Sequence, residues 1–562
     1  MINEEIFTEQ AEYLSLDSFE KWSTKLHEEA NIIRKLSQSG AKLITGPRGC
    51  GKTTLFLKVN QKLLQDKSST TLPIYVNFKS SLKLEPLYRN NTNAAHWFNQ
   101  WLLHKVLYSL YESIENKKFE KNEFSSLMDK NRVDDVINLL ELGNIEGFKG
   151  ETMTSSSLIE RIEFVLSKLN IKKCVLLLDD AGHAFSSEQQ QDFFEFFREI
   201  KTKNISPKAA VYPGVTNYSS SFHIGHDAEE IDVWLKPNSE GYLEFMHSVL
   251  RSRFGQNNFE ELLKYKNSLN LLCYAAYGIP RSLLNMISSF YKSDDSKNDF
   301  KIKLQNKGVL SAIKNNYNRT YQIYDSLRIK LPMYEKFIDI GGSIYERFLN
   351  INKDFNRGNN TKKQSSTIAI KRPINSELLK VLGFFQYAGL LSYQGISNRG
   401  NKGVYELFDL HYSSIIDRNV FFSSRGINFE NYCFAFENRP NHHYPRHSAS
   451  GILEDLGNNI KFELSLPSCP NCNTPRASEE SKFCANCGVK LKDASIFESI
   501  VKQDISLLPI TENRARSIKT NSNISTVKDI IMDTDNKQLF KVPQVGPYWA
   551  KKIKSYAEEF FA

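Results

Sequence analysis

The sequence predicts a chain of several domains, of which the first is an α/β domain built on a parallel sheet. Three observations support this prediction. A strand-like segment at residues 41–45 runs into a glycine-rich loop and then into a helical pattern. A second apolar segment, residues 173–178, ends in the two acids Asp179 and Asp180. Four cysteines at 469–487 form two CxxC pairs, which indicates a small separate domain around a metal.

The composition is that of a globular protein in an aqueous compartment. With 562 residues, the chain is several times longer than a typical domain of about 150 residues. It is 40% hydrophobic and 24% charged, and no apolar run approaches the ~18 residues that a membrane span needs. The first residues also lack the basic and apolar blocks of a signal peptide. We therefore expect a cytoplasmic protein that does not bind membranes.

The net charge and the distribution of cysteines limit which partners and which cellular compartment are possible. The formal net charge is +9, from 73 basic and 64 acidic residues, which permits nucleic-acid binding without demonstrating it. Four of the eight cysteines are scattered and four are clustered. This distribution favours a reducing cytosol and one metal site over a disulfide framework.

The loop at residues 46–53 has the pattern GxxxxGK[ST] between a predicted strand and a predicted helix. Its glycines let backbone N–H groups turn toward phosphates, and the helix that follows presents its positive end. We expect Lys52 to reach the β and γ phosphates of ATP and Thr53 to bind Mg²⁺. The predicted nucleotide site consists of Gly46, Pro47, Arg48, Gly49, Cys50, Gly51, Lys52, Thr53 and Thr54.

Residues 173–180 predict the second strand of this site. A parallel strand buried on both faces is a continuous apolar run, as this one is. We expect Asp179 to lie beside Thr53 at the metal and Asp180 to orient the attacking water. The alternative is that the two acids cap a helix that begins near Ser186. The phosphate loop upstream favours the nucleotide interpretation.

Two further stretches, AAVYPGVTN at 209–217 and YGIPRSLLN at 277–285, are a core strand with a polar end and the start of a helix. Together with the phosphate loop and LLLDD, they resemble AAA+ ATPases of the initiator type, related to origin-recognition and helicase-loading proteins. The resemblance covers residues 20–295 or so. It implies that Asn217 senses the γ-phosphate and that Arg281, in a helical lid, contacts the same phosphate.

Two features depart from that family. No arginine occurs between Arg198 and Arg251, where the finger that acts on a neighbouring subunit is usual. Asp180 stands where the family usually has glutamate, and its side chain is one methylene shorter. Both features argue against ATP hydrolysis across the subunit interfaces of an assembled ring. Whether the chain forms oligomers stays open.

The rest of the ATPase region is predicted to be helical. Almost one hundred residues separate the strand at 72–78 from LLLDD, with aromatic and apolar residues at helical spacing, which predicts a helical insertion. Residues 240–292 predict three amphipathic helices of the lid. We place the ATPase base at 1–235 and the lid at 236–298.

Residues 299–455 are predicted to be helical and to include a winged-helix-like unit. A helix at 377–387 precedes strands at 389–393 and 403–408, and the turn between the strands contains Arg399 and Lys402. These two side chains either contact DNA phosphates or are only solvated. The segment 442–447 contains three histidines without acids or cysteines nearby, so we expect a loop without a metal.

Residues 460–493 resemble a short zinc ribbon. Two CxxC pairs, eleven residues apart, place four thiolates around one cation, and four soft ligands without an open position suit structural Zn²⁺. Gly488 and Leu491 follow in the usual trailing positions. A ribbon binds DNA, RNA or protein, or only stabilises a small domain, and the pattern does not decide among these. The ligands are Cys469, Cys472, Cys484 and Cys487.

Residues 498–562 resemble tandem helix-hairpin-helix units, at 508–518 and 542–553, with a connecting helix at 524–531. In the second unit, Gly546 is expected to offer backbone N–H groups to a DNA phosphate, and Lys551 and Lys552 add positive charge. In the first unit Thr511 replaces the glycine, which suggests a structural role. Paired hairpins also bind proteins, so a protein partner is the alternative to DNA.

Our leading hypothesis is an ATP-hydrolysing AAA+ protein that binds DNA through its C-terminal modules and uses ATP, Mg²⁺ and Zn²⁺. The alternative is a nucleotide-gated switch or adaptor with little turnover that recruits a partner such as a nuclease or helicase. The missing arginine finger and Asp180 favour the second. Lys52, Thr53, Asp179 and Arg281 are required by both. DNA preference, oligomeric state and pathway do not follow from the sequence.

Overall fold

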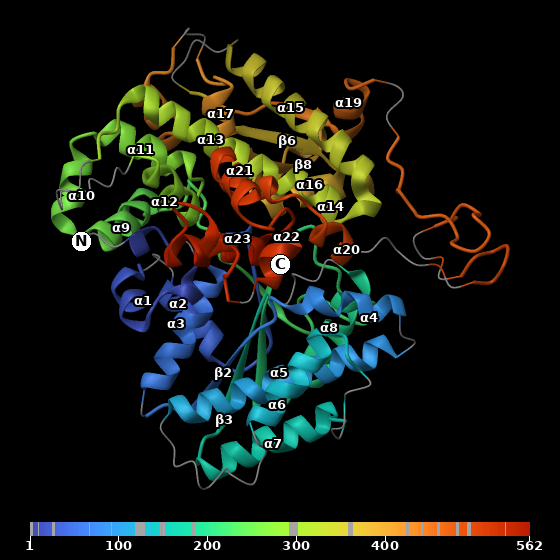
Figure 1. The fold of residues 1–562 in the computed structure, drawn as a ribbon. Helices are drawn as coiled ribbons and strands as arrows, with labels where there is room; N and C mark the ends of the chain where they lie inside the picture. The colour runs from blue at the N-terminus through green and yellow to red at the C-terminus, as the bar shows by residue number, and fades with distance from the viewer. Residues whose placement is uncertain are drawn as a thin grey trace.

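The computed structural model places the C-terminal helices between two larger parts of the molecule (Figure 1). A parallel sheet and its helices form one part, and a mostly helical region with a second sheet forms the other. Among the described residues, no helix is long and apolar enough to cross a membrane. The structure describes residues 4–8, 10–24, 29–66, 68–90, 93–117, 130–145, 148, 152–180, 186–290, 302–357, 363–422, 426–439, 442–457, 461–478, 481, 483–489, 491, 496–533 and 535–561.

The first sheet has five parallel strands in the order β2-β3-β4-β1-β5, which confirms the predicted α/β core. Because all strands run the same way, their carboxyl ends meet at one edge, and Asp179 pairs in register with Asn77 there. The strands are β1 (Lys42–Thr45), β2 (Thr71–Asn77), β3 (Lys173–Asp179), β4 (Ile205–Val211) and β5 (Glu229–Asp232).

Both faces of this sheet are covered. Along β3, Val175 and Leu177 pack into one core, whereas Leu176 and Leu178 pack into the other, as period-two alternation requires. Helix α3 (Lys52–Gln65) belongs to the first face. The predicted helical insertion covers the second face with α5 (Ala94–Asn116), α6 (Lys130–Glu141) and α7 (Ser155–Lys168), together with α8 (Ser187–Glu199).

Strand β4 differs from the prediction at both ends. It begins at Ile205, four residues before the predicted start, and ends at Val211. Its first half is polar yet buried, because the Lys208 ammonium donates hydrogen bonds to the carbonyls of Gln38 and Gly40. Pro213 and Gly214, the latter in the left-handed region (φ 74°), follow the strand end. Asn217 consequently lies in a loop.

The described part of residues 236–298, the predicted lid, contains four helices, so the prediction of three is wrong. Gly255 (φ 79°) is both the C-cap of α9 and the N-cap of α10, and thereby divides one long apolar pattern. Only glycine adopts this conformation readily. The helices are α9 (Tyr242–Phe254), α10 (Gln256–Leu263), α11 (Lys266–Ala275) and α12 (Pro280–Ser288).

A second, mixed sheet lies in the middle region. Its order is β7-β8-β6-β9; β8 is antiparallel to both neighbours, whereas β9 is parallel to β6. Strand β9 (Arg446–Ser448) corrects the predicted loop at 442–447, because residues 446 and 447 pair with β6. The other elements are α13 (Asn306–Asp325), α14 (Leu327–Lys330), α15 (Glu335–Arg357), β6 (Thr367–Lys371), α16 (Ser376–Ala388), β7 (Leu391–Asn398), β8 (Val404–Leu410), α17 (Tyr412–Asp417), α18 (Phe429–Glu437) and α19 (Ala449–Glu454).

The last segment folds around a core of its own. Buried apolar residues from Ile505 to Ala557 form one cluster, separate from the cores of the two sheets. The connecting helix is α22 (Val527–Met532), shorter than predicted and begun by the capping box of Thr526 and Asp529. The other helices are α20 (Ile496–Val501), α21 (Glu512–Asn521) and α23 (Pro547–Phe561).

Candidate functional site

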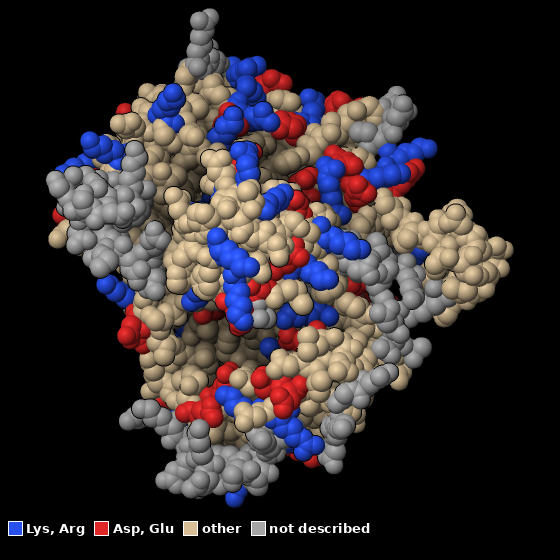
Figure 2. Space-filling view, viewed as in Figure 1, with Lys and Arg blue, Asp and Glu red and all other residues tan. Residues whose placement is uncertain are grey.

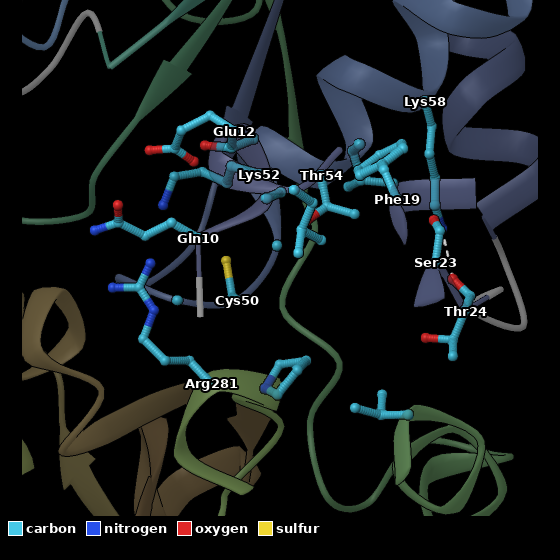
Figure 3. A pocket seen from close by; sticks show the side chains of 18 of the residues that line it. Gln10, Glu12, Phe19, Ser23, Thr24, Cys50, Lys52, Thr54, Lys58 and Arg281 are labelled. Atoms are coloured by element: carbon cyan, nitrogen blue, oxygen red, sulfur yellow. Dashed lines mark hydrogen bonds between the residues drawn. The ribbon is translucent and has the colours of Figure 1, made fainter. Parts of the chain in front are cut away.

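A cavity of about 170 Å³ opens at the carboxyl edge of the parallel sheet (Figure 3). Its lining comes from the phosphate loop and the start of α3, the N-terminal segment, α9, α12 and the last turns of α23, together with Lys79, Asp180 and Tyr212, which follow strands β2, β3 and β4. Of the residues predicted for the nucleotide site, the cavity brings together Arg48, Gly49, Cys50, Gly51, Lys52, Thr53, Thr54, Asp180 and Arg281.

The phosphate loop curls around the ammonium group of Lys52. Lys52 Nζ donates hydrogen bonds to the carbonyls of Gly46 at 2.7 Å and Pro47 at 3.0 Å. Gly49 (φ 80°) and Gly51 (φ 104°) adopt left-handed conformations, and Gly51 is the N-cap of α3. With the carbonyls directed at the lysine and the glycines reversing the chain, the loop leaves backbone N–H groups for an anion at the start of α3.

The ring of Tyr212 forms one wall of the site. Lys52 Nζ lies 3.7 Å from the centroid of this ring, and the Tyr212 hydroxyl donates to Asp180 Oδ1 at 3.4 Å. Burial lowers the pKa of Lys52, while Cys50, Asp180 and Asp179 act to raise it. Sequence reasoning missed Tyr212. Its position directly after β4 could have identified it, but the polar start of β4 made the bounds of that strand hard to predict.

Asn217 lies elsewhere. Its backbone N–H donates to Gln190 Oε1 at 2.6 Å, and it is not among the described residues that line the cavity. The γ-phosphate role of Asn217 therefore stays a prediction, and Tyr212 occupies the end of the strand from which that role was inferred.

Asp179 is 1% exposed and lies beside Thr53, as predicted for a metal pair. Its carboxylate accepts hydrogen bonds from Thr53 and, at 2.9 Å, from the Tyr75 hydroxyl. Burial and then the charge of Asp180 raise the pKa of Asp179. A carboxylate and a hydroxyl at a phosphate loop are hard oxygen ligands, so this pair fits Mg²⁺.

Asp180 has left-handed backbone (φ 54°), which directs it away from the line of β3 and into the cavity. Its own N–H donates to Asp179 Oδ1 at 3.0 Å. The alternative, in which the acids cap α8, does not hold: α8 begins at Ser187 and its N-cap is Ser186, whose side chain accepts from the Gln189 N–H. Residues 181–185 lie outside the described residues.

Two arginines meet one carboxylate at the far end of the phosphate loop. Arg281, in the first turn of α12, extends toward the loop (Figure 3) and forms an ion pair with Glu559 of α23. Arg48 Nη2 donates to the Glu559 carbonyl at 3.1 Å, and its guanidinium lies 4.0 Å from Glu559 Oε1. Glu559 was not foreseen, because no local motif marks an acid at the end of a helix as part of a distant site.

The wall of the cavity that includes Phe19 and Thr24 mixes apolar and polar side chains (Figure 3), and Val249 and Leu284 also line the cavity. The Lys58 ammonium fixes this wall, since it donates to the Thr24 carbonyl and, at 2.6 Å, to Glu29 Oε2. Cationic side chains at the phosphate loop and apolar side chains elsewhere in the lining suit a ligand with phosphates and an aromatic base.

The four predicted zinc ligands converge. Their sulfur atoms all lie within 4.8 Å of one another, and Cys469–Cys487 and Cys472–Cys484 are each 3.5 Å apart. A tetrahedron with Zn–S bonds of ~2.3 Å has edges of about 3.8 Å, so the set fits zinc. Asn473 (φ 56°) and Gly488 (φ 70°) make the left-handed turn that closes each CxxC knuckle.

Basic side chains lie on two further surfaces. At the turn between β7 and β8, Arg399 Nη2 donates to the Tyr444 hydroxyl at 3.3 Å, and Lys402 is exposed. Figure 2 shows Lys and Arg side chains gathered over the area of α21, α22 and α23. The exposed bases of this segment are Lys502, Arg516, Lys519, Lys528, Lys537, Lys541 and Lys551.

The two segments predicted as helix-hairpin-helix units differ in how their helices begin. Gly546 is exposed immediately before α23, and Lys552 lies 5.2 Å from the Trp549 ring centroid. Thr511 is the N-cap of α21, and its hydroxyl accepts from the Arg514 N–H at 3.3 Å. Thr511 thus stabilises the start of its helix.

No model of a known protein family and no curated protein gives a significant match to this chain. Among solved structures, it is similar to the Orc1 protein of Aeropyrum pernix in complex with DNA, with 13% identity, a TM-score of 0.24 and coverage of 71% of this chain and 92% of that chain. It is also similar to Cdc6p from Pyrobaculum aerophilum, with 11% identity, a TM-score of 0.29 and coverage of 72% and 97%. The similarity to Orc1 and Cdc6 proteins is distant.

Proposed function

We propose that this chain is an AAA+ protein that binds and hydrolyses ATP and couples its nucleotide state to the engagement of DNA or a partner. The observation that carries this proposal is one cavity in which the phosphate loop, Asp180 and Arg281 face one another, next to the Thr53–Asp179 pair. Such a set has few uses other than the binding of a nucleoside triphosphate with a divalent cation.

Each residue has a role in this chemistry. Lys52 and the loop N–H groups hold the β and γ phosphates, and Arg281 approaches them from the lid. Thr53 and Asp179 hold Mg²⁺, which neutralises charge on the phosphates when it is bound. Asp180 accepts a proton from the attacking water. Tyr212 orients Asp180 through its hydroxyl and packs its ring on Lys52.

DNA is proposed to contact the turn between β7 and β8 and the C-terminal hairpins. The order α15, β6, α16, β7, β8, with β8 between β6 and β7, resembles a winged helix. The second half of helix α16 is mostly buried, whereas its first turns are partly exposed. We place the contacts to DNA phosphates at Arg399 and Lys402 in the turn between β7 and β8. The bases around α21 and α23, and the exposed Gly546, suit phosphate contacts of helix-hairpin-helix units.

A second candidate function is a nucleotide-gated switch or adaptor with little turnover, which recruits a protein through the zinc ribbon or the hairpins. One contact in the structure favours it, because Arg281 is paired with Glu559. The absence of arginine between Arg198 and Arg251 in the sequence points the same way.

Steady-state ATP turnover with and without duplex DNA separates the two functions. Lys52→Ala and Asp180→Asn should each abolish DNA-stimulated turnover if the chain is an ATPase. Lys62→Ala, at an exposed position of the same helix α3, and Asp134→Asn, at an exposed position of α6, are matched controls that should retain it. Tight ATP binding without turnover under any condition would establish the switch instead.

A further inference from the structure

The last helix of the chain ends inside the candidate nucleotide site. Glu559 lies in the last turns of α23, 278 residues after Arg281, and its carboxylate pairs with that arginine. The same carboxylate lies 4.0 Å from Arg48, which also binds the Glu559 carbonyl. One acid thus engages the cation of the lid and the cation of the phosphate loop at the same time.

The positive charge around Glu559 exceeds what one carboxylate neutralises. Lys330 at the end of α14 is only 2% exposed; burial and then Arg48 lower its pKa well below the ordinary value, while Glu559 acts to raise it. Burial opposes the ionisation of Glu559, yet Arg281, Arg48 and Lys79 lower its pKa to about 2. Two arginines that face one carboxylate form a site for an anion of higher charge.

Polar contacts hold one face of α23 in this position, and Phe560 adds an apolar contact with the core that includes α3 and α12. Ser555 Oγ donates to Gln10 Oε1 at 2.7 Å, Gln10 Nε2 donates to Glu559 Oε2 at 3.1 Å, and the Tyr13 hydroxyl donates to Glu558 Oε2 at 2.7 Å. These acceptors and donors share one face of the helix, because they are three and four residues apart.

The apolar face of α23 packs elsewhere. Ala550, Ile553 and Ala557 belong to the core of the C-terminal segment itself, and α23 packs on α20 and α22. The end of α23 therefore can leave the nucleotide site while that core stays intact. Release of this end costs the hydrogen bonds to Gln10 and Tyr13, the ion pair of Glu559 and the packing of Phe560. A phosphate group replaces the contacts to the two arginines.

We infer that Glu559 is an internal competitor for the terminal phosphate of a nucleoside triphosphate at the Arg48–Arg281 site, so that triphosphate binding releases the end of α23. This inference rests on the proposed nucleotide binding. The cavity of about 170 Å³ is smaller than the ~300 Å³ at which small-molecule sites usually begin, as expected where the chain itself fills part of the site. A diphosphate is one phosphate shorter and leaves Glu559 paired.

Release of α23 changes how the second hairpin is presented. Lys551 lies 5.6 Å from the Tyr13 ring centroid while α23 is docked. Gly546 precedes the same helix. Triphosphate binding therefore frees a helix with a basic side chain and a hairpin. Because the coupling between two binding sites is reciprocal, a ligand that binds the freed helix should also tighten the binding of the triphosphate.

Equilibrium binding of a fluorescent ATP analogue and a fluorescent ADP analogue to the full-length chain tests this inference. Glu559→Gln keeps the shape of the side chain and removes its charge. The substitution removes the charged hydrogen bond with which Glu559 competes against the ligand. The ATP analogue should therefore bind at least about tenfold more tightly, and the affinity for the ADP analogue should change little. Glu512→Gln is the matched control, because Glu512 is exposed on α21 of the same C-terminal segment and is none of the residues that hold α23 at the site, and it should bind both analogues as the wild type does.

Hydrogen exchange of residues 546–561 provides the second readout. ATP should increase exchange in the wild type, and Glu559→Gln should show the increased exchange before ATP is added. Equal or weaker ATP-analogue binding by Glu559→Gln would overturn the inference; if Lys52→Ala then abolishes binding, the proposed nucleotide binding still stands. Absence of binding by wild type and Glu559→Gln alike would overturn both.

Discussion

Gly214 and Gly383 meet backbone to backbone where the parallel sheet contacts the middle region. Gly214 lies in the loop after β4 and Gly383 lies within α16. A Cβ on Gly214 would lie 2.2 Å from the carbonyl carbon of Gly383, and a Cβ on Gly383 would lie 2.7 Å from Gly214 Cα. The loop that follows Tyr212 is therefore fixed by a helix from another part of the chain.

Gly214→Ala should destabilise the protein by more than 2 kcal/mol or so, because a left-handed alanine costs roughly 1 kcal/mol and the clash with backbone adds to it. Gly225→Ala is the control: Gly225 is also left-handed (φ 90°), but nothing lies within 4 Å of its Cβ position. Urea unfolding of both variants measures the difference. Equal losses of unfolding free energy would mean that the close approach is not maintained in solution.

Stability should depend on pH through His411. This side chain is 0% exposed, caps α17 by accepting the Ser413 N–H at Nδ1, and has its pKa lowered by burial from 6.5 to about 3. As pH falls below 6.5, the unfolded chain takes up a proton that the folded chain does not. The unfolding free energy should therefore fall by about 2 kcal/mol between pH 7 and pH 5 from this group.

His411→Asn tests this assignment, because asparagine is a good N-cap that does not titrate. Urea unfolding at pH 7 and pH 5 should show a loss about 2 kcal/mol smaller in the variant than in the wild type, whatever the absolute stability of the variant. The same loss in both proteins would place the acid sensitivity in another group.

Metal analysis should find one zinc per chain, and Cys469→Ser should remove it. Cys433→Ser is the control, since Cys433 is a single cysteine on α18 whose Sγ donates to the Asn267 carbonyl at 3.6 Å. Zinc supplies the folding energy of such small modules, and among the described residues only Leu491 packs with the four cysteines in a core of their own. Chelation should therefore increase hydrogen exchange at residues 469–491 and leave the parallel sheet protected. Zinc retained by Cys469→Ser would contradict the four-thiolate site.

The sequence predicted those parts of the site that short motifs encode. The phosphate loop, Asp179, Arg281 and the CxxC pairs were placed correctly relative to strands and helices, because each depends on local spacing. Tyr212 was missed because buried polar residues such as Lys208 hid the start of β4. Glu559 was out of reach for another reason: only tertiary packing brings the last helix to the phosphate loop.

The backbone at Asp180 accounts for aspartate at a position where glutamate is usual. Its φ of 54° is left-handed, a conformation that aspartate and asparagine tolerate better than other non-glycine residues. Asp180→Glu should therefore cost about 1 kcal/mol of unfolding free energy relative to Asp180→Asn, and it should not raise ATP turnover, because the longer acid is held in a strained turn. Urea unfolding and steady-state turnover of the two variants check this. Higher turnover by Asp180→Glu would show that the length of the acid, rather than the turn that presents it, limits the chemistry.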